Sequence, residues 1–196
     1  MSENYEKKLG ISTAAAYHEK DDTEHSRYEP TDYAVLERLA KSGLITAQNV
    51  VVDYGCGKGR VGFFLHSAVG CKTVGIEYNP ELCAAAEANL NTYTLRRAGG
   101  ISFVCESAEN YIPDGADCFY FFNPFSEKIL RSVLGRIYES YYSDPRGMKL
   151  IFYYPLDSYL SLLMTEDMLT FHSDIDCRDI FGRDDIHEKI SVFTVG

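Results

Sequence analysis

The sequence predicts an α/β protein built around a single doubly wound, mostly parallel sheet of seven strands. Short β-branched or aromatic runs recur along the chain and alternate with segments of helical periodicity. The first run, at 50–52, contains no polar residue and suits a strand that is buried on both faces. The last two runs, at 169–175 and 190–195, flank a charged loop with few residues for a crossover helix. We therefore expect a C-terminal antiparallel strand.

The elements of the first half follow from their boundary residues. A helix is expected from about Thr31 to Gly43, because glycine commonly ends a helix and apolar residues before it share one face. The second strand is expected at 72–77. Asn79 and Pro80 then supply an N-cap and a first helical residue, and the alanine-rich segment through about 91 favours a helix.

The second half continues the alternation. Strands are expected at 101–105 and 118–122, and the second of these is entirely aromatic or apolar. Apolar residues at helical spacing predict an amphipathic helix from 126 to about 142, with Ser126 as its N-cap. A fifth strand follows at 149–154, and Pro155 opens a short helix through about 164.

The composition is that of one globular domain. The chain has 196 residues, enough for a single well-buried core, and 45% of them are hydrophobic. Its six cysteines show no C-x-x-C spacing, which favours reduced, buried thiols over disulfides or a metal site. The first residues lack the apolar core of a signal peptide, and no apolar run reaches membrane-spanning length. We therefore expect a cytoplasmic protein without a membrane partner.

The charge limits the partners that the protein would bind. A net charge of −10 makes a large nucleic acid unsuitable, because a phosphate backbone needs a stripe of basic residues. Arg96 and Arg97 form the only adjacent arginine pair. A small molecule or a basic protein segment stays compatible with this charge, and solubility alone would also account for it. The oligomeric state is not predicted.

Three alternating glycines follow the first strand, lead into an apolar, helix-like segment and predict a cofactor site. Gly55, Gly57 and Gly59 lack Cβ atoms where the chain must turn and where a ligand must approach the backbone. Asp53 lies at the carboxyl end of the strand, the edge where open α/β sheets bind ligands. A glycine-rich turn without a ligand is the alternative.

Two phosphate-binding interpretations fit the glycines less well. Residues 57–62 satisfy the dinucleotide pattern G-x-G-x-x-G, which would indicate an NAD-dependent oxidoreductase. The pattern begins five residues after Val52, however, and Asp53 would repel a diphosphate while it would attract an ammonium group. A phosphate loop is excluded because Lys58 is not followed by Ser or Thr.

The run Asp-x-Gly-x-Gly-x-Gly after a strand resembles motif I of the class I (Rossmann-like) S-adenosylmethionine-dependent methyltransferases, and the resemblance extends over residues 30–196. It implies S-adenosyl-L-methionine as cofactor and S-adenosyl-L-homocysteine as product. It also implies that the glycine loop binds the methionine moiety, that Asp53 favours its ammonium, and that an acid after the second strand binds the ribose. The cofactor-binding residues expected on this basis are Asp53, Gly55, Cys56, Gly57, Gly59, Glu77, Tyr78, Glu106, Ser107 and Asn123.

The adenine contact is less defined. Related enzymes often place an aspartate after the third strand, whereas this chain has Ser107 there, next to Glu106. Glu77 lies roughly 20 residues beyond the glycine loop, where NAD enzymes also carry an acid, so it supports an adenosine cofactor without choosing between the two.

Asn123, Pro124 and Phe125 follow the fourth strand and resemble a shortened form of the Asn/Asp-Pro-Pro-Tyr/Phe motif of methyltransferases that act on nitrogen. The resemblance implies that they orient the acceptor, a nitrogen on a small molecule or protein. A simple Asn-Pro turn is the alternative. A non-catalytic member of the fold that binds only cofactor or a partner is a further one.

Residues 1–29 form an N-terminal extension ahead of the domain at 30–196. Similar methyltransferases fold such an extension over the cofactor, and the expected contacts to the substrate come from Tyr28, with Tyr33 as a second candidate. Partial disorder without a function is the other interpretation of this segment.

Overall fold

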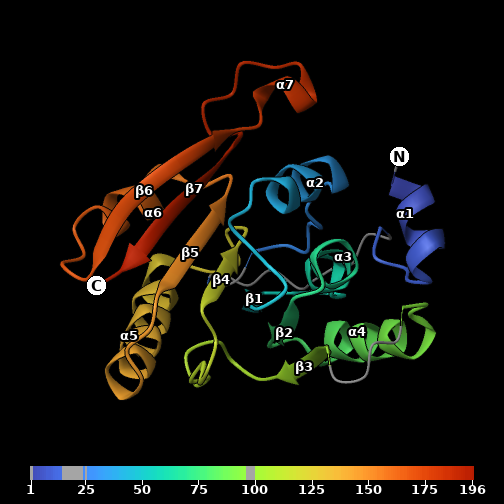
Figure 1. Ribbon diagram of the computed structural model, residues 1–196, viewed down its shortest axis with the longest axis horizontal. Helices are drawn as coiled ribbons and strands as arrows, with labels where there is room; N and C mark the ends of the chain where they lie inside the picture. The colour runs from blue at the N-terminus through green and yellow to red at the C-terminus, as the bar shows by residue number, and fades with distance from the viewer. Residues whose placement is uncertain (1, 15–23, 25, 96–99) are drawn as a thin grey trace.

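The computed structural model describes residues 2–14, 24, 26–95 and 100–196, and it contains the predicted seven-stranded sheet (Figure 1). The strand order is β3-β2-β1-β4-β5-β7-β6, with β1 to β5 parallel and β7 antiparallel to both of its neighbours. The strands are β1 (Val50–Tyr54), β2 (Lys72–Glu77), β3 (Ile101–Cys105), β4 (Cys118–Phe121), β5 (Met148–Tyr153), β6 (Leu169–Asp176) and β7 (Lys189–Val195). The fold class and the C-terminal antiparallel strand are confirmed.

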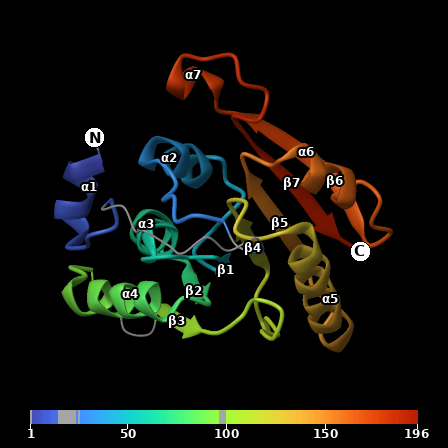
Figure 2. The ribbon, with the colours of Figure 1, turned by 180° about the vertical axis from the view of Figure 1, so that it is seen from behind.

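Helices cover both faces of the sheet, as the two opposite views show (Figures 1 and 2). One core cluster joins the sheet to the first three helices, and the other joins it to the fifth and sixth. The helices are α1 (Ser2–Leu9), α2 (Tyr33–Lys41), α3 (Arg60–Val69), α4 (Pro80–Thr92), α5 (Glu127–Ser143), α6 (Asp157–Leu163) and α7 (Arg178–Phe181). Among the described residues, no helix combines the length and the apolar character needed to cross a membrane.

Polar side chains start the helices where the sequence predicts. Asn79 accepts hydrogen bonds from the backbone amides of Glu81 and Leu82, and the Ser126 hydroxyl accepts one from Ile129. The first long helix, α2, begins slightly later than expected. Its N-cap is Asp32, whose Oδ1 accepts the amide of Ala34 at 2.8 Å.

Two helices were not expected. α1 lies in the polar N-terminal stretch, and its buried Leu9 and the following Ile11 belong to the core cluster beneath α2 and α3. α7 is a four-residue helix in the charged loop between β6 and β7. Neither segment has a periodic run of apolar residues, because only a few side chains of each face the core. Residues 15–23 and 25 of the predicted extension lie outside the described residues.

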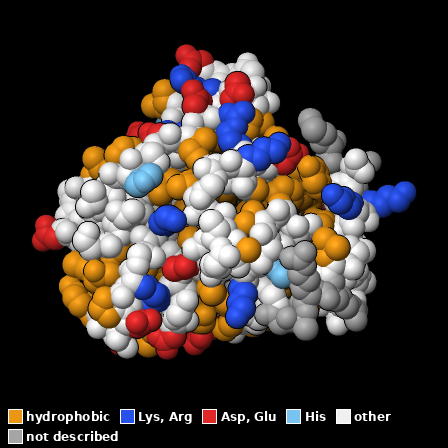
Figure 3. Space-filling model, in the orientation of Figure 1, with side chains coloured by type: hydrophobic (Ala, Val, Ile, Leu, Met, Phe, Trp, Pro, Cys, Tyr) orange, Lys and Arg blue, Asp and Glu red, His pale blue; other side chains and the backbone are white. Residues whose placement is uncertain are grey.

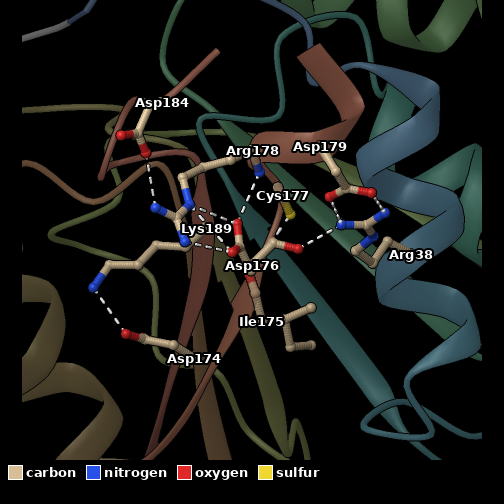
Figure 4. A network of polar contacts seen from close by, with 9 residues as sticks. All are labelled: Arg38, Asp174, Ile175, Asp176, Cys177, Arg178, Asp179, Asp184 and Lys189. Atoms are coloured by element: carbon tan, nitrogen blue, oxygen red, sulfur yellow. Dashed lines mark hydrogen bonds and ion pairs between the residues drawn. The ribbon is translucent and has the colours of Figure 1, made fainter. Parts of the chain in front are cut away.

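An ion-pair network fastens α7 to the rest of the domain (Figure 4). The guanidinium of Arg38, on α2, donates to both carboxylate oxygens of Asp179 and to the Asp176 carbonyl. Arg178 binds Asp176 and Asp184. These side chains are largely exposed, so water and salt weaken their mutual attraction.

The expectation of six reduced, buried thiols is wrong for one pair. Cys83, in the first turn of α4, forms a disulfide with Cys105 at the end of β3, and their Cα atoms lie 5.7 Å apart. Sequence spacing does not reveal the pair, because the chain leaves α4 and returns along β3 before the two residues meet. Cys56, Cys71, Cys118 and Cys177 are free and buried.

Candidate active site

The glycine loop connects β1 to α3 and turns sharply at each of its three glycines. Gly55, Gly57 and Gly59 all have positive φ, at 72°, 53° and 86°. The carbonyl of Ile76 on β2 accepts the amides of Gly55 at 2.9 Å and Cys56 at 3.0 Å, which holds the loop against the neighbouring strand. A Cβ atom on Gly55 would lie 2.4 Å from Cβ of Pro124. The loop therefore requires glycine for its conformation and for its packing.

A cavity opens at the carboxyl ends of β1, β2 and β4, next to this loop. Its walls come from the N-terminal segment, the glycine loop, the end of β2 and the loops after β3 and β4. The predicted site residues that line it are Tyr28, Asp53, Gly55, Cys56, Glu77, Tyr78, Glu106, Pro124 and Phe125. Residues far apart in the sequence thus meet at one edge of the sheet.

Asp53 is the most unusual group in the cavity. Its side chain is 3% exposed, and its Oδ2 atom has no hydrogen-bond partner among the described residues. Burial, and secondarily the negative charge of Glu77, raise the pKa of Asp53 to about 8. A buried carboxyl oxygen without a hydrogen-bond donor is costly, and a positively charged or hydrogen-bond-donating ligand in the cavity would satisfy it.

Glu77 joins the two loops that border the cavity. Its Oε2 accepts the amide of Gly57 at 2.9 Å, and its Oε1 accepts the amide of Asn79 at 3.0 Å. The residue is 6% exposed and is the last residue of β2. The carboxylate therefore holds the glycine loop and the start of α4 in a fixed relation.

The loop after β3 places only one of its two candidates at the cavity. Glu106 lines it, and its amide donates to the Glu77 carbonyl at 2.9 Å. Ser107 is not part of the lining, and its hydroxyl lies 3.5 Å from Oε2 of Glu109. Of this pair, Glu106 is therefore the residue placed to contact a ligand in the cavity.

The loop after β4 shows a similar division. Pro124 and Phe125 line the cavity, but Asn123 does not. Asn123 has a φ of +42°, and its amide nitrogen donates to the carbonyl of Tyr154, which has a φ of +51°. Non-glycine residues rarely adopt this conformation, so the ends of β4 and β5 share a strained connection. The Oδ1 atom of Asn123 is buried and has no hydrogen-bond partner in the part of the chain that the structure describes.

The N-terminal segment covers the glycine loop through Tyr28. A Cβ atom on Gly57 would lie 2.2 Å from the Tyr28 ring, so the ring rests directly on the loop. The Tyr28 hydroxyl donates to the Thr13 carbonyl at 2.6 Å, and burial raises its pKa. Tyr33, the second tyrosine candidate, is buried in the core cluster and is not part of the cavity lining.

Arg60 is a residue of this site that the sequence analysis missed. It is the first residue of α3, and its guanidinium donates to the hydroxyl of Thr13 at 2.7 Å, the carbonyl of Thr31 at 3.1 Å and Oε1 of Glu6 at 3.2 Å. An arginine directly after the glycine loop opposes the helix dipole, and this was the available signal. Arg60 connects α1 and the segment before α2 to the edge of the cavity.

Comparison with known proteins relates the chain to methyltransferases. The family model for the methyltransferase domain matches residues 51–140. A histone-lysine N-methyltransferase specific for lysine 79 of histone H3, from Dictyostelium discoideum, is 37% identical over 68 residues. This match covers 35% of the chain and 4% of the other protein, so the chain spans a small part of this curated relative.

Solved structures share the fold at low sequence identity. An RNA methyltransferase from Salinibacter ruber, in complex with S-adenosyl-L-homocysteine, has a TM-score of 0.56 and 16% identity, over 85% of this chain and 94% of that one. A TehB-like S-adenosylmethionine-dependent methyltransferase from Corynebacterium glutamicum has a TM-score of 0.57 and 17% identity, over 82% and 87%.

The sheet order, the glycine loop and the acid after β2 define an α/β protein with a cavity at the switch point of its sheet, where open α/β sheets bind ligands. The domain model matches residues 51–140, slightly less than half of the chain, and the solved structures show that the chain shares the fold of S-adenosylmethionine-dependent methyltransferases. The comparisons do not support the alternative of an NAD-dependent oxidoreductase.

Proposed function

We propose that this protein is an S-adenosyl-L-methionine-dependent methyltransferase that transfers the methyl group to a nitrogen on a small molecule or a protein. The observation that carries the cofactor part is the unpartnered Oδ2 of Asp53 in the cavity, which would accept the ammonium of the methionine moiety. Glu77 would accept a ribose hydroxyl, because it ends β2 beside the glycine loop. Glu106 would lie on the adenine side of the cavity.

The acceptor would bind against the loop after β4. Pro124 and Phe125 form an apolar wall there, on which a planar or aliphatic group would pack. The similarity to a histone-lysine N-methyltransferase, though short, supports a nitrogen over an oxygen or a carbon acceptor. Asn123 is not part of the cavity lining, but it stays a candidate for a polar contact to the nitrogen, since its buried Oδ1 has no hydrogen-bond partner among the described residues.

The chemistry that we propose requires placement more than acid–base strength. The sulfonium of the bound cofactor would supply an activated methyl group, so the protein would have to align an uncharged nitrogen with it. Tyr28 would exclude water from the glycine loop, which strengthens the electrostatic contacts of Asp53. The role of the N-terminal segment as a lid is part of this proposal.

Surface charge supports a small or basic acceptor. On the face in Figure 3, the basic side chains that are drawn in blue lie scattered among acidic and apolar ones, without a continuous basic patch. The net charge of −10 agrees with a cationic acceptor. The cytoplasmic location expected from the sequence stays a prediction.

Transfer of a labelled methyl group tests the proposal. The wild-type protein would be incubated with S-adenosylmethionine carrying a tritiated methyl group and with lysine-rich peptides, free amines, catechols and short RNA in parallel. We expect label in an amine or peptide fraction. The Phe125→Ala variant should lose most of this transfer while it still binds S-adenosylhomocysteine. Labelling confined to the catechol or RNA fractions contradicts a nitrogen acceptor on a small molecule or protein, and binding without any transfer would favour the non-catalytic alternative.

A further inference from the structure

The Cys83–Cys105 disulfide lies directly behind the cofactor cavity. Leu82 lines the cavity one residue before Cys83, and Glu106 lines it one residue after Cys105. The bond therefore joins the start of α4, which follows the loop after Glu77, to the end of β3, which pairs with the end of β2 at Glu77.

The pair also contacts Glu77 itself. Sγ of Cys83 lies 3.2 Å from the Glu77 carbonyl, which also accepts the amide of Glu106 at 2.9 Å. The carboxylate of the same residue holds the amides of Gly57 and Asn79. The disulfide thus links the start of α4 and the end of β3, the two segments that lie next to Glu77.

The two sulfurs differ in their access to solvent. Cys105 is exposed at the end of its strand, whereas Cys83 is 8% exposed and lies in the first turn of a helix. A thiol reagent can therefore reach Cys105. Cys83 suits the role of leaving group, because a helix N-terminus stabilises a thiolate. Once reduced, its S–H can donate to the Glu77 carbonyl that it already contacts.

We infer that Cys83 and Cys105 form a thiol–disulfide exchange site that sets the affinity of the protein for its cofactor. The bonded state holds Glu77, the start of α4 and Glu106 in the arrangement that the cavity needs. Reduction removes the covalent link between β3 and α4, so part of the binding free energy must then be used to order these groups. This inference rests on the cofactor site and is independent of the identity of the acceptor.

Glutathione can supply both thiols that reduction of the Cys83–Cys105 disulfide requires. A glutathione thiolate attacks Sγ of Cys105, the Cys83–Cys105 bond breaks, and its electron pair stays on Cys83, which takes a proton from water. A second glutathione thiolate attacks the glutathione sulfur of the mixed disulfide and releases Cys105. Two glutathiones are oxidised to one glutathione disulfide, and the protein gains two thiols.

Calorimetric titration with S-adenosylhomocysteine tests the inference on the full chain. One sample is equilibrated with glutathione disulfide and the other with excess reduced glutathione, and alkylation under denaturing conditions counts the thiols in each. We expect the oxidised protein to bind at least about fivefold more tightly. By reciprocity, saturating S-adenosylhomocysteine should shift the reduction midpoint by the same factor, with ~30 mV corresponding to tenfold.

Cysteine variants assign the effect to this pair. Cys83→Ser and Cys105→Ser should bind like the reduced wild type at every glutathione ratio. Cys71→Ala, a change at a free cysteine just before the opposite end of β2, should keep the full redox response. Equal affinity of oxidised and reduced wild type overturns the inference even where a variant does not fold, as does a pair that stays reduced in glutathione disulfide. Binding in neither state overturns the cofactor site as well.

Discussion

Asp53 and Glu77 are two buried carboxylates of one cavity, and their surroundings differ. Glu77 accepts backbone hydrogen bonds from Gly57 and Asn79, whereas Oδ2 of Asp53 has no partner among the described residues. Glu77 therefore organises the protein around it, and Asp53 is left for a ligand.

Cofactor binding should release a proton from Asp53. The pKa of this residue is raised to about 8, so at pH 7 the free protein holds it mostly protonated, while the ammonium group of the ligand requires the ionised form. Affinity for S-adenosylhomocysteine should therefore rise about tenfold per pH unit below pH 8 and level off above it. Calorimetry at pH 7 in phosphate and Tris, which differ in ionisation enthalpy, should show release of close to one proton. Asp53→Asn should bind weakly and without this pH dependence.

The same carboxyl should make the unliganded protein less stable as pH rises. Its pKa is about 8 when folded and near 3.8 when unfolded, so between these values the folded state binds the extra proton. Its contribution to stability is thus fully present below about pH 4 and is lost as pH rises to about 8. Relative to wild type, Asp53→Asn should gain about 2 kcal/mol in the free energy of unfolding between pH 6 and pH 8. Urea denaturation at both pH values measures this difference, and parallel curves would contradict it.

Two replacements of Glu77 should show how much its two hydrogen bonds contribute to cofactor binding. In Glu77→Gln, one of the two acceptor positions becomes an amide donor that faces a backbone N–H, so one bond is lost and one is kept. We expect S-adenosylhomocysteine to bind about tenfold more weakly to this variant and about a hundredfold more weakly to Glu77→Ala. Calorimetry provides both constants. Equal losses would show that the hydrogen bonds do not organise the loop.

Much of this architecture could be predicted from the sequence because the signals are local. The buried strands are continuous apolar runs, and Asn79 and Ser126 cap the helices that the sequence assigns to them. Asp53 and the glycines are likewise recognisable from a pattern of neighbouring residues. These features depend on a residue and its immediate neighbours in the chain.

The features that the sequence analysis missed depend on contacts between distant segments. Arg60 meets Glu6 across 54 positions, and Cys83 meets Cys105 only because β3 returns beside α4. Asn123 lies in the predicted loop, but the strained connection to Tyr154 turns its amide nitrogen away to the end of β5. Spacing and composition carry no record of such contacts, so the structure was needed to find them.

Two arginines with comparable hydrogen bonding should contribute very differently to stability. The side chains of Arg60 and Glu6 are 7% and 15% exposed, whereas those of Arg38 and Asp179 are 31% and 69% exposed. Arg60→Met leaves the partly buried Glu6 without its cation, although Thr13 still donates to it, and removes the guanidinium hydrogen bonds to Thr13 and Thr31, so it should cost about 3–5 kcal/mol. Arg38→Met should cost at most about 1 kcal/mol, because solvent already screens that pair.

Urea denaturation of both variants measures the difference. Adding Glu6→Gln to Arg60→Met should recover part of the loss, since the orphaned charge is then removed. Similar losses for the two arginine variants, or no recovery in the double variant, would contradict the assignment of Arg60 as the buried connection to α1.

A methyl group at Gly57 should be far more damaging than one at Gly43. Both glycines have positive φ, at 53° and 78°, so alanine strains the backbone at either position by about 1–2 kcal/mol. A Cβ at Gly43 meets nothing within 4 Å, whereas at Gly57 it would lie 2.2 Å from the Tyr28 ring. Gly57→Ala must therefore also displace the ring that covers the cofactor loop.

In urea denaturation, we expect the free energy of unfolding of Gly43→Ala to fall only by the cost of the backbone strain. This variant should bind S-adenosylhomocysteine like wild type. Gly57→Ala should lose more stability and bind at least about tenfold more weakly, because Tyr28 no longer shields the loop. In the double variant Gly57→Ala, Tyr28→Ala, the steric part of the stability loss disappears, so the two changes should be less than additive. Cofactor affinity should not recover, since the Tyr28 ring that covers the glycine loop is absent from this variant. Full recovery of affinity in the double variant would show that Tyr28 has no role in holding the cofactor.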